Sequence, residues 1–361
     1  MKILIWGTGN TTIDAMLYLR EDIEVVAFVD SYAKNEDELF LGKPVITIEK
    51  ADKYDWEMLV ICSIHKEAIL DKIQQKGIPL TNVLCFDKNM LCKVARYKQD
   101  LFHKCIKRLE DNVDEVEMLI TGISYHGEGI VDNLFAKTTV NFAMRSQDLF
   151  FDYYILNYVF SNYRLDQLKY VMIGLCYYSF DHDFSKTHNA WEMIRYYPEI
   201  QKGHNLIEDC VFEEWCVQEM NEIMASDKLT SVFSWKMRFR FSDAEGQKEA
   251  AIYFKENRPI TVLENKLLLK KYLELLEKKN IKPIIVIMPV TGYYSKFVPE
   301  VAKERFYTNL YEVLGKKEVQ ILDYFDRCFY PDEYFYNVSH LNKKGAEVFT
   351  KRLEQDIVWR L

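Results

Sequence analysis

Residues 2–12 read Lys2-Ile3-Leu4-Ile5-Trp6-Gly7-Thr8-Gly9-Asn10-Thr11-Thr12. The apolar run before Gly7 is typical of a buried strand, and the two glycines that follow mark a tight turn. A helical pattern occupies Thr11–Arg20, and a second strand pattern occupies Glu24–Val29. A strand, a turn, a helix and a further strand in this order predict an α/β fold with a parallel sheet and right-handed crossovers.

The same alternation continues along the chain. Up to residue 87 we expect strands at 2–6, 24–29, 57–62 and 82–86 and helices at 11–20 and 65–75. After a Lys- and Arg-rich helix at 88–110, we expect strands at 117–121, 139–142, 169–174, 282–288 and 320–323, with helices at 147–163, 264–280 and 342–355. These patterns predict two three-layer α/β domains with mainly parallel sheets. The first covers residues 1–90, a helical connector covers 91–114, and the second covers 115–361 with a helical insertion at roughly 180–260.

Composition restricts the possible partners. The 361 residues include 47 basic and 55 acidic side chains, and the formal charge of -8 disfavours nucleic acid and anionic lipid. No segment approaches the roughly 18 apolar residues of a membrane helix, and the first apolar run is too short for a signal peptide. The eight cysteines form no CxxC pair, as expected of reduced thiols. We expect a cytoplasmic protein with no membrane span and no metal centre, and the oligomeric state stays open.

The glycine turn has the arrangement of a dinucleotide-binding turn. In such a turn the first glycine, here Gly7, allows the bend, and the second, Gly9, lets the backbone approach a phosphate at the helix N-terminus near Asn10. Asp30 closes the next strand, where its carboxylate would accept a hydrogen bond from a ribose hydroxyl. Thr12 stands where a third glycine is expected, so a turn that binds no ligand is the alternative.

Residues 1–90 resemble the Rossmann-like domains of nucleoside-diphosphate-sugar epimerases and the small N-terminal domains of sugar acyltransferases. The shared features are the glycine turn, Asp30 after Val25-Val26-Ala27-Phe28-Val29, and Gly42-Lys43-Pro44-Val45. The resemblance implies a Rossmann-like module that binds a sugar nucleotide or NAD. Hydride transfer would also need a catalytic half with a Tyr-xxx-Lys pair, so binding or scaffolding is favoured over an NAD-dependent sugar-nucleotide enzyme.

A serine and a histidine stand at opposite ends of the second predicted domain. Gly122-Ile123-Ser124 follows the first strand of this domain, at a turn that exposes a serine hydroxyl and its backbone N–H. Near the other end, Asn337-Val338-Ser339-His340 precedes the last helix. We predict that His340 lies within hydrogen-bonding range of Ser124, or within one water of it, and acts as its general base.

Residues 115–361 resemble the SGNH/GDSL hydrolase superfamily, which implies a flavodoxin-like α/β domain that needs no cofactor. Ser124 matches the nucleophile, and His340-Leu341-Asn342-Lys343-Lys344-Gly345 matches the block that contains the histidine. Two further segments resemble the middle blocks: Asn141-Phe142-Ala143-Met144-Arg145-Ser146-Gln147 and Tyr170-Val171-Met172-Ile173-Gly174-Leu175-Cys176. Pro289 after the strand at 284–288 is similar to the subgroup with the D-alanyl-lipoteichoic-acid protein and alginate O-acetyltransferase-like enzymes.

Three positions depart from the pattern of this superfamily. Asn337 stands in place of an aspartate, Ser146 in place of a glycine that supplies an oxyanion N–H, and Cys176 in place of an asparagine that supplies another donor. Ser146 can still donate through its backbone, whereas loss of one oxyanion donor costs ~10²–10³ in rate. Asn337 can orient His340 through its carbonyl but cannot stabilise an imidazolium as a carboxylate does.

Two other histidine-containing segments are candidates for the site. His126, two residues beyond Ser124, either lines the pocket or forms a local turn. Asp181-His182-Asp183 with His188 lies in one short loop without a second ligand cluster, so solvated loop charges are favoured over a metal site.

We therefore expect a serine-dependent esterase or O-acyltransferase that acts on a saccharide or a cell-surface polysaccharide precursor. Its partner would be a small-molecule or glycan substrate, and the choice between water and a sugar hydroxyl as acceptor stays open. The alternative is a non-catalytic component of polysaccharide biosynthesis that binds glycan precursors, because Asn337 and Cys176 weaken the catalytic pattern.

Overall fold

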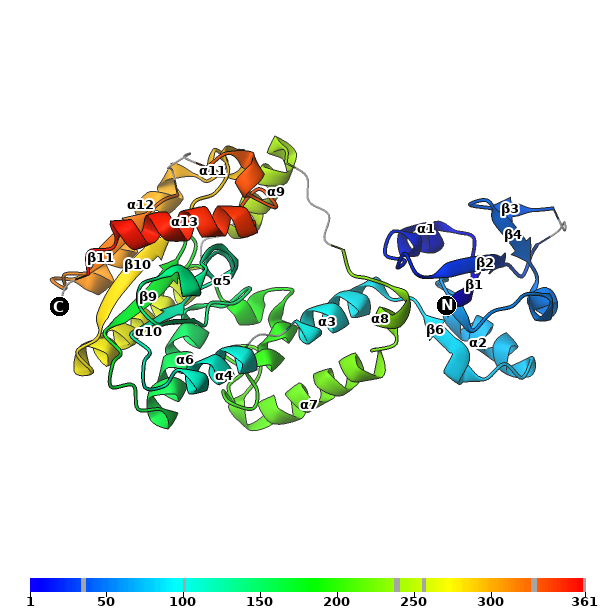
Figure 1. Cartoon of the computed structure of the whole chain (residues 1–361), viewed down its shortest axis with the longest axis horizontal. Coiled ribbons are helices and arrows are strands. Elements are labelled where there is room, and N and C mark those ends of the chain that lie inside the picture. Colours follow the sequence, from blue (N-terminus) through cyan, green and yellow to red (C-terminus); the bar gives the residue numbers. More distant parts are fainter. Residues whose placement is uncertain (34–36, 100–101, 237–240, 255–257, 326–329, 360–361) are drawn as a thin grey trace. The chain divides into compact units, whose positions relative to one another are not determined.

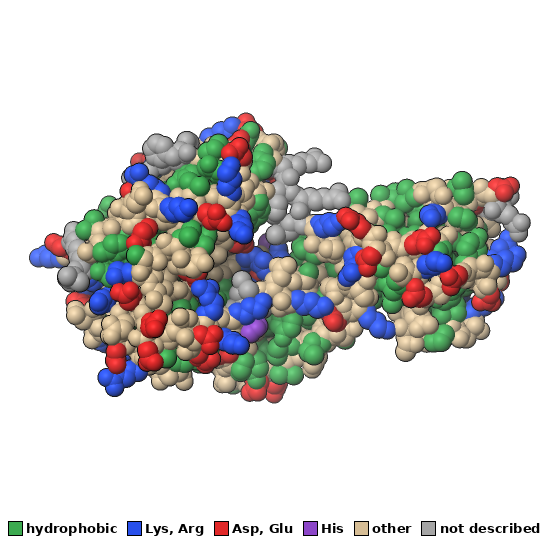
Figure 2. Space-filling model, in the orientation of Figure 1, with side chains coloured by type: hydrophobic (Ala, Val, Ile, Leu, Met, Phe, Trp, Pro, Cys, Tyr) green, Lys and Arg blue, Asp and Glu red, His purple; other side chains and the backbone are tan. Residues whose placement is uncertain are grey.

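The computed structural model describes residues 1–33, 37–99, 102–236, 241–254, 258–325 and 330–359 (Figure 1). The chain forms two compact units: unit 1 contains Met1–Gln99 and Val217–Met237, and unit 2 contains Asp100–Cys216 and Arg238–Leu361. Both are α/β with mainly parallel sheets, which confirms the predicted fold class. Basic and acidic side chains are interspersed on the face shown in Figure 2.

Unit 1 is built on a six-stranded sheet with the order β3-β4-β2-β1-β5-β6, parallel except where β3 pairs with β4. The strands are β1 (Lys2–Trp6), β2 (Glu24–Val29), β3 (Leu39–Phe40), β4 (Lys43–Ile46), β5 (Met58–Ile61) and β6 (Val83–Cys85). Along β1, Ile3 and Ile5 belong to one apolar cluster and Leu4 and Trp6 to another. Because alternate side chains of a strand point to opposite faces, the sheet is covered on both. Its helices include α1 (Asn10–Met16) and α2 (Lys66–Gln75).

The domain boundaries differ from those predicted. The expected helix at 88–110 is two helices, α3 (Lys88–Lys98) in unit 1 and α4 (Phe102–Asp111) in unit 2, so the connector at 91–114 is divided between the units. A middle segment of the insertion, Val217–Met237, also belongs to unit 1. Phe233 and two residues of α8 (Leu229–Val232) lie in the same apolar cluster as β1, and Trp235 stacks on Tyr18 at 5.4 Å between ring centroids. Apolar residues of the insertion thus complete the core of the first unit, which sequence periodicity does not reveal.

Unit 2 contains an all-parallel five-stranded sheet with the order β11-β10-β9-β7-β8. Its strands are β7 (Met118–Thr121), β8 (Thr139–Asn141), β9 (Tyr170–Leu175), β10 (Lys282–Ile287) and β11 (Gln320–Asp323). After β7 the chain first adds β8 on one side and then β9 on the other, so the strand order reverses at β7. Ligands of open α/β sheets bind at the carboxyl ends of the strands at such a switch point.

Helices cover this sheet on both sides. Besides α4, unit 2 contains α5 (Ser124–Gly129), α6 (Leu149–Asn162), α9 (Asp243–Phe254), α10 (Pro259–Lys278), α11 (Gly292–Ser295), α12 (Glu300–Leu314) and α13 (Lys343–Asp356), and the boundary between the units falls within α7 (Asp209–Ala225). Helix α13 packs against α5, whereas α10 packs against α6 and α12 (Figure 1). Among the described residues, no helix combines the length and apolar character needed to cross a membrane.

Candidate active site

Ser124 is the first residue of α5, directly beyond the carboxyl end of β7. The turn that places it needs a glycine at position 122. Gly122 has φ of +138°, and a Cβ there would lie 2.8 Å from the Cα of Gly174 on the neighbouring strand. The tight turn therefore ends the strand and leaves the hydroxyl of Ser124 half-buried at the switch point of the sheet.

Ser124 and His340 meet as predicted. Ser124 Oγ lies 2.8 Å from Nε2 of His340, although 216 positions separate them in the sequence. His340 lies in the loop between β11 and α13, where an isolated bridge between Phe335 and Leu341 closes the backbone around it. The ring of Tyr125 packs against the imidazole at 4.6 Å between centroids.

The surroundings of His340 favour its neutral form. Burial, with a further contribution from the positive charge of Arg145, lowers the pKa of His340 to about 3. A neutral imidazole has one protonated and one unprotonated ring nitrogen. If Ser124 donates to Nε2, the proton of the ring is on Nδ1, which is the tautomer that a general base for this serine requires.

The side chain of Asn337 lies closer to the backbone N–H groups around His340 than to the imidazole ring. Its Oδ1 accepts hydrogen bonds from the backbone N–H groups of Ser339 at 2.9 Å and His340 at 2.7 Å. The distance from this oxygen to Nδ1 of His340 is 3.2 Å, whereas Ser339 Oγ lies 2.9 Å from Nδ1. The predicted orienting residue is therefore present, but the hydroxyl of Ser339 is the closer partner of the imidazole.

The structure adds Glu249, which sequence reasoning did not single out. The hydroxyl of Ser339 donates a hydrogen bond to Oε1 of Glu249 on α9. Glu249 lies in an ordinary charged helical segment 90 positions from Ser339, so no spacing in the sequence indicates this contact. An acidic side chain thus lies one hydroxyl away from His340.

Ser146, which stands where the resembled pattern has a glycine, has a backbone conformation that favours glycine. Its φ is +58°, in the left-handed region that favours glycine. The first part of the insertion holds this segment: His182 Nε2 donates to the carbonyl of Ser146 at 2.8 Å, and Asn189 Nδ2 donates to its hydroxyl at 3.2 Å. Residue 146 is thereby fixed beyond the carboxyl end of β8. Whether its N–H contacts an oxyanion stays a prediction.

Cys176 and His126 have local roles. Burial raises the pKa of the Cys176 thiol to about 11, so it is neutral at pH 7, and its Sγ contacts Ser179 Oγ at 3.3 Å. The expectation that His126 lines the pocket is wrong, because its side chain is fully buried and Nε2 donates to the carbonyl of Val286 at 3.0 Å. A Cβ on Gly174 would overlap its ring, and burial lowers the pKa of His126 to about 4. His126 is therefore a buried packing residue beneath the turn that carries Ser124, and its side chain does not reach an open pocket.

The loop at 181–183 does not act as one cluster. Asp181 pairs with Arg305 at 3.2 Å and His182 contacts Ser146, while Asp183 lies with Asp148 and His204. The carboxylate oxygens of Asp148 and Asp183 and a ring nitrogen of His204 lie within 4.8 Å of one another, and these three atoms could hold a cation. However, Lys186 Nζ already lies 2.6 Å from Asp183. Although burial acts to lower it, the pKa of His204 is raised by Asp148 and Asp183. We interpret the group as an internal ion cluster that ties the insertion to the start of α6.

In unit 1 the predicted nucleotide-binding residues line a common recess of about 570 Å³, which includes Gly7, Gly9, Asn10 and Asp30. Asp30 accepts from the hydroxyl of Thr8 at 2.7 Å. Thr12, in place of the third glycine, is buried and donates to the carbonyl of Gly7 at 2.9 Å, so its side chain locks the turn.

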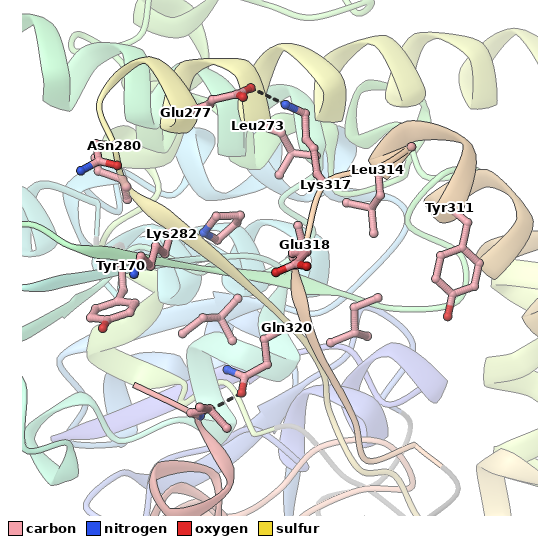
Figure 3. A pocket seen from close by; sticks show the side chains of 17 residues that line it. Tyr170, Leu273, Glu277, Asn280, Lys282, Tyr311, Leu314, Lys317, Glu318 and Gln320 are labelled. Atoms are coloured by element: carbon pink, nitrogen blue, oxygen red, sulfur yellow. Dashed lines mark hydrogen bonds and ion pairs between the residues drawn. The ribbon is translucent and has the colours of Figure 1, made fainter. Parts of the chain in front are cut away.

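A recess of about 830 Å³ in unit 2 lies at the amino ends of the strands (Figure 3). Ser124, in contrast, follows the carboxyl end of β7. The walls of the recess include Tyr170, Lys282 and Gln320, which begin β9, β10 and β11, and the ion pair between Glu277 and Lys317 spans one side. The amino ends of parallel strands face away from the switch-point site, so this recess is separate from the Ser124–His340 pair.

Two family models match parts of the chain. Residues 1–84 match one described as C2185-like, N-terminal, and residues 268–354 match one described as DltD protein. The second match includes His340 but not Ser124. No curated protein sequence matches the chain. The nucleotide-sugar resemblance of the first segment stays a prediction.

Solved structures are similar to this chain at low sequence identity. A proposed platelet activating factor from Streptococcus pneumonia is 13% identical, with 80% of this chain and 98% of that chain covered and a TM-score of 0.35. A catalytic mutant of Axe2, an acetylxylan esterase from Geobacillus stearothermophilus, is 9% identical, with 69% and 99% covered and a TM-score of 0.33. A proposed lipolytic protein of the G-D-S-L family from Desulfitobacterium hafniense DCB-2 is 14% identical, with 67% and 99% covered and a TM-score of 0.32.

Proposed function

We propose that unit 2 is a serine-dependent esterase or O-acyltransferase. The observation that carries the proposal is the 2.8 Å contact between Ser124 Oγ and a neutral His340 Nε2 at the switch point of the sheet. The DltD match over residues 268–354 supports the same reaction class. A saccharide ester is the proposed substrate, from the resemblance of residues 115–361 to O-acyl-transferring subgroups of the SGNH superfamily.

The reaction proceeds in two steps. As Ser124 Oγ bonds to the acyl carbon, its proton moves to Nε2 of His340, and the carbonyl oxygen becomes an oxyanion near the backbone N–H of Ser124. When the intermediate collapses, the alkoxide of the alcohol leaves with that proton. A second oxygen then attacks the acyl-serine and gives its proton to His340, which returns it to Ser124. Water as acceptor releases the acid, and a sugar hydroxyl forms a new ester.

A fluorophosphonate probe tests this proposal without knowledge of the substrate. We expect the probe to modify Ser124 covalently, as located by peptide mass spectrometry, and p-nitrophenyl acetate to be hydrolysed. Ser124→Ala and His340→Gln should abolish both signals, whereas Ser231→Ala and His188→Gln, at exposed positions, should not. Unchanged hydrolysis in Ser124→Ala would reject this serine as the nucleophile.

A non-catalytic glycan-binding component is the second candidate, favoured by Asn337 and Cys176 at positions where the superfamily has stronger catalytic groups. In that case the folded wild-type chain would bind glycan precursors but would resist the probe at every serine. Robust labelling of Ser124 rejects this candidate.

For unit 1 we propose a nucleotide-binding role, with a sugar nucleotide favoured over NAD. The recess that joins the glycine turn to Asp30 supports it. The full chain should be screened, because residues 217–237 complete the core of unit 1. A ligand at a hundredfold excess over its dissociation constant stabilises by about 2.7 kcal/mol. UDP-, CDP- or GDP-sugars should raise the melting temperature of wild type but not of Asp30→Ala; no shift with any of them or with NAD(H) would indicate a scaffold.

A further inference from the structure

The site has a buried hydroxyl where its superfamily uses a direct carboxylate contact. Ser339 is 1% exposed, and its Oγ lies between Nδ1 of His340 and Oε1 of Glu249. A hydroxyl has a single proton to donate and can also accept. With Glu249 ionised, Ser339 donates to the carboxylate and accepts from Nδ1–H, which leaves Nε2 free to accept from Ser124.

Helix α9 is anchored so that Glu249 faces Ser339. Gly246, one turn earlier, lies against the carbonyl of Tyr293, and a Cβ at this position would overlap that oxygen. Tyr253, one turn later, stacks on Tyr178 at 4.0 Å between centroids and an angle of 9°. Residues 246, 249 and 253 share one face of a helix because 3.6 residues make a turn. Close packing at both ends therefore fixes the carboxylate between them.

We infer that Glu249 is the acidic positioning residue of this site and acts through the hydroxyl of Ser339 to hold His340 in its Nδ1–H tautomer and stabilise its imidazolium. The inference rests on the proposed function, because that reaction needs the Nδ1–H tautomer so that Nε2 can accept the proton of Ser124. Asn337 has no carboxylate to offer the imidazole. Glu249 supplies one, and the hydroxyl of Ser339 connects it to Nδ1 of His340.

The charges around Glu249 are compatible with this role. Burial raises its pKa, with Glu245 contributing in the same direction, while the hydrogen bond from Ser339 lowers it. The other titratable groups that interact with it are the phenols of four tyrosines, whose pKa values burial raises, so they are neutral: Tyr125, Tyr253, Tyr294 and Tyr336. Glu249 is therefore the acidic group that the hydroxyl of Ser339 contacts.

The tautomer of His340 is the direct readout. Nitrogen NMR of the imidazole side chains at pH 8, assigned with His340→Gln, should show Nδ1 protonated in wild type. In Glu249→Gln the amide can donate to Ser339, which then donates to Nδ1, and we expect the Nε2–H form to gain population. Glu245→Gln, one turn away without a bond to Ser339, is the matched control and should keep the wild-type tautomer. An unchanged tautomer in folded Glu249→Gln would overturn the inference, whether or not the chain shows esterase activity.

Labelling kinetics at Ser124 supply a second readout. Glu249→Gln should slow fluorophosphonate labelling at least about tenfold, a smaller loss than the ~10⁴ that follows loss of a directly bonded carboxylate in the chymotrypsin system. Because Glu249 acts through Ser339, Ser339→Ala combined with Glu249→Gln should be no slower than the slower single variant.

Rescue distinguishes positioning from a merely structural role. Asn337→Asp places a carboxylate beside Nδ1 and should restore labelling of Glu249→Gln to within about threefold of wild type, since the proton of Nδ1 again has an anionic acceptor. Additive losses in the double variant, or failure of the rescue in a folded protein, would contradict the inference. Absence of labelling in wild type would instead reject the proposed function, and the tautomer measurement would still decide the role of Glu249.

Discussion

Ser339 Oγ lies 2.9 Å from Nδ1 of His340, so the residue immediately before the histidine in sequence is its closest polar partner on that side of the ring. Oδ1 of Asn337 is further from Nδ1, at 3.2 Å, and accepts hydrogen bonds from two backbone N–H groups. The loop therefore separates two tasks that an aspartate performs together in a conventional triad: shaping the turn and orienting the imidazole.

Asn337 is expected to matter for the turn. Asn337→Ala removes the acceptor of the buried N–H of Ser339 and of the partly buried N–H of His340, and should lower the unfolding free energy of unit 2 by about 1–3 kcal/mol. Asn337→Asp keeps the acceptor and should stay near wild type in stability. Denaturant unfolding of the two variants checks the prediction, and equal stability of Asn337→Ala and wild type would contradict it.

The pH dependence of labelling should reflect the depressed pKa of His340. The base must be neutral, and with a pKa of about 3 it stays neutral far below the usual 6.5 of histidine. The labelling rate of Ser124 should therefore show no decline between pH 8 and about pH 5. An inflection near 6.5 would show that the imidazole is not desolvated as in this structure.

The lowered pKa of His340 should also make the unfolding free energy depend on pH. Between about pH 6.5 and 3 the unfolded chain binds a proton at this histidine that the folded chain does not, so the unfolding free energy falls as the pH falls through this window. His340→Gln removes this contribution and should lose less stability on acidification than wild type. Circular dichroism at each pH separates acid unfolding from loss of labelling.

Gly174 is expected to tolerate no side chain. In Gly174→Ala the added methyl group would overlap the ring of His126 under the turn that carries Ser124, at a cost of about 1–3 kcal/mol. Gly292→Ala is the control, because a Cβ at that position meets no atom within 4 Å. Thermal melts should separate the two variants; equal melting temperatures would show that His126 can move aside.

Phe233 is expected to stabilise unit 1. It is 1% exposed and packs against Phe86 at 4.8 Å between centroids, so Phe233→Ala should cost about 3–5 kcal/mol. Hydrogen exchange should rise within residues 1–99, while labelling of Ser124 in unit 2 stays unchanged. Phe241→Ala removes a partly exposed ring from unit 2 and is the control. Exchange confined to unit 2 in Phe233→Ala would contradict the assignment of residues 217–237.

The α/β class and the strands of both sheets except β3 and β4 could be predicted from the sequence alone, whereas the contact between Ser124 and His340 was predicted from their two motifs and is confirmed by the structure. Strands buried on both faces are continuous apolar runs, and glycine is required where Gly122 turns, so these features are local and leave a pattern. The helix α12 at 300–314 was not predicted, and the insertion was placed wholly in the second domain. Three contacts could be learned from the folded structure alone: Phe233 completes the core of unit 1, His126 packs against Gly174, and Glu249 contacts Ser339. Each of these depends on residues distant in sequence, and burial and hydrogen bonding across such distances have no period from which they can be predicted.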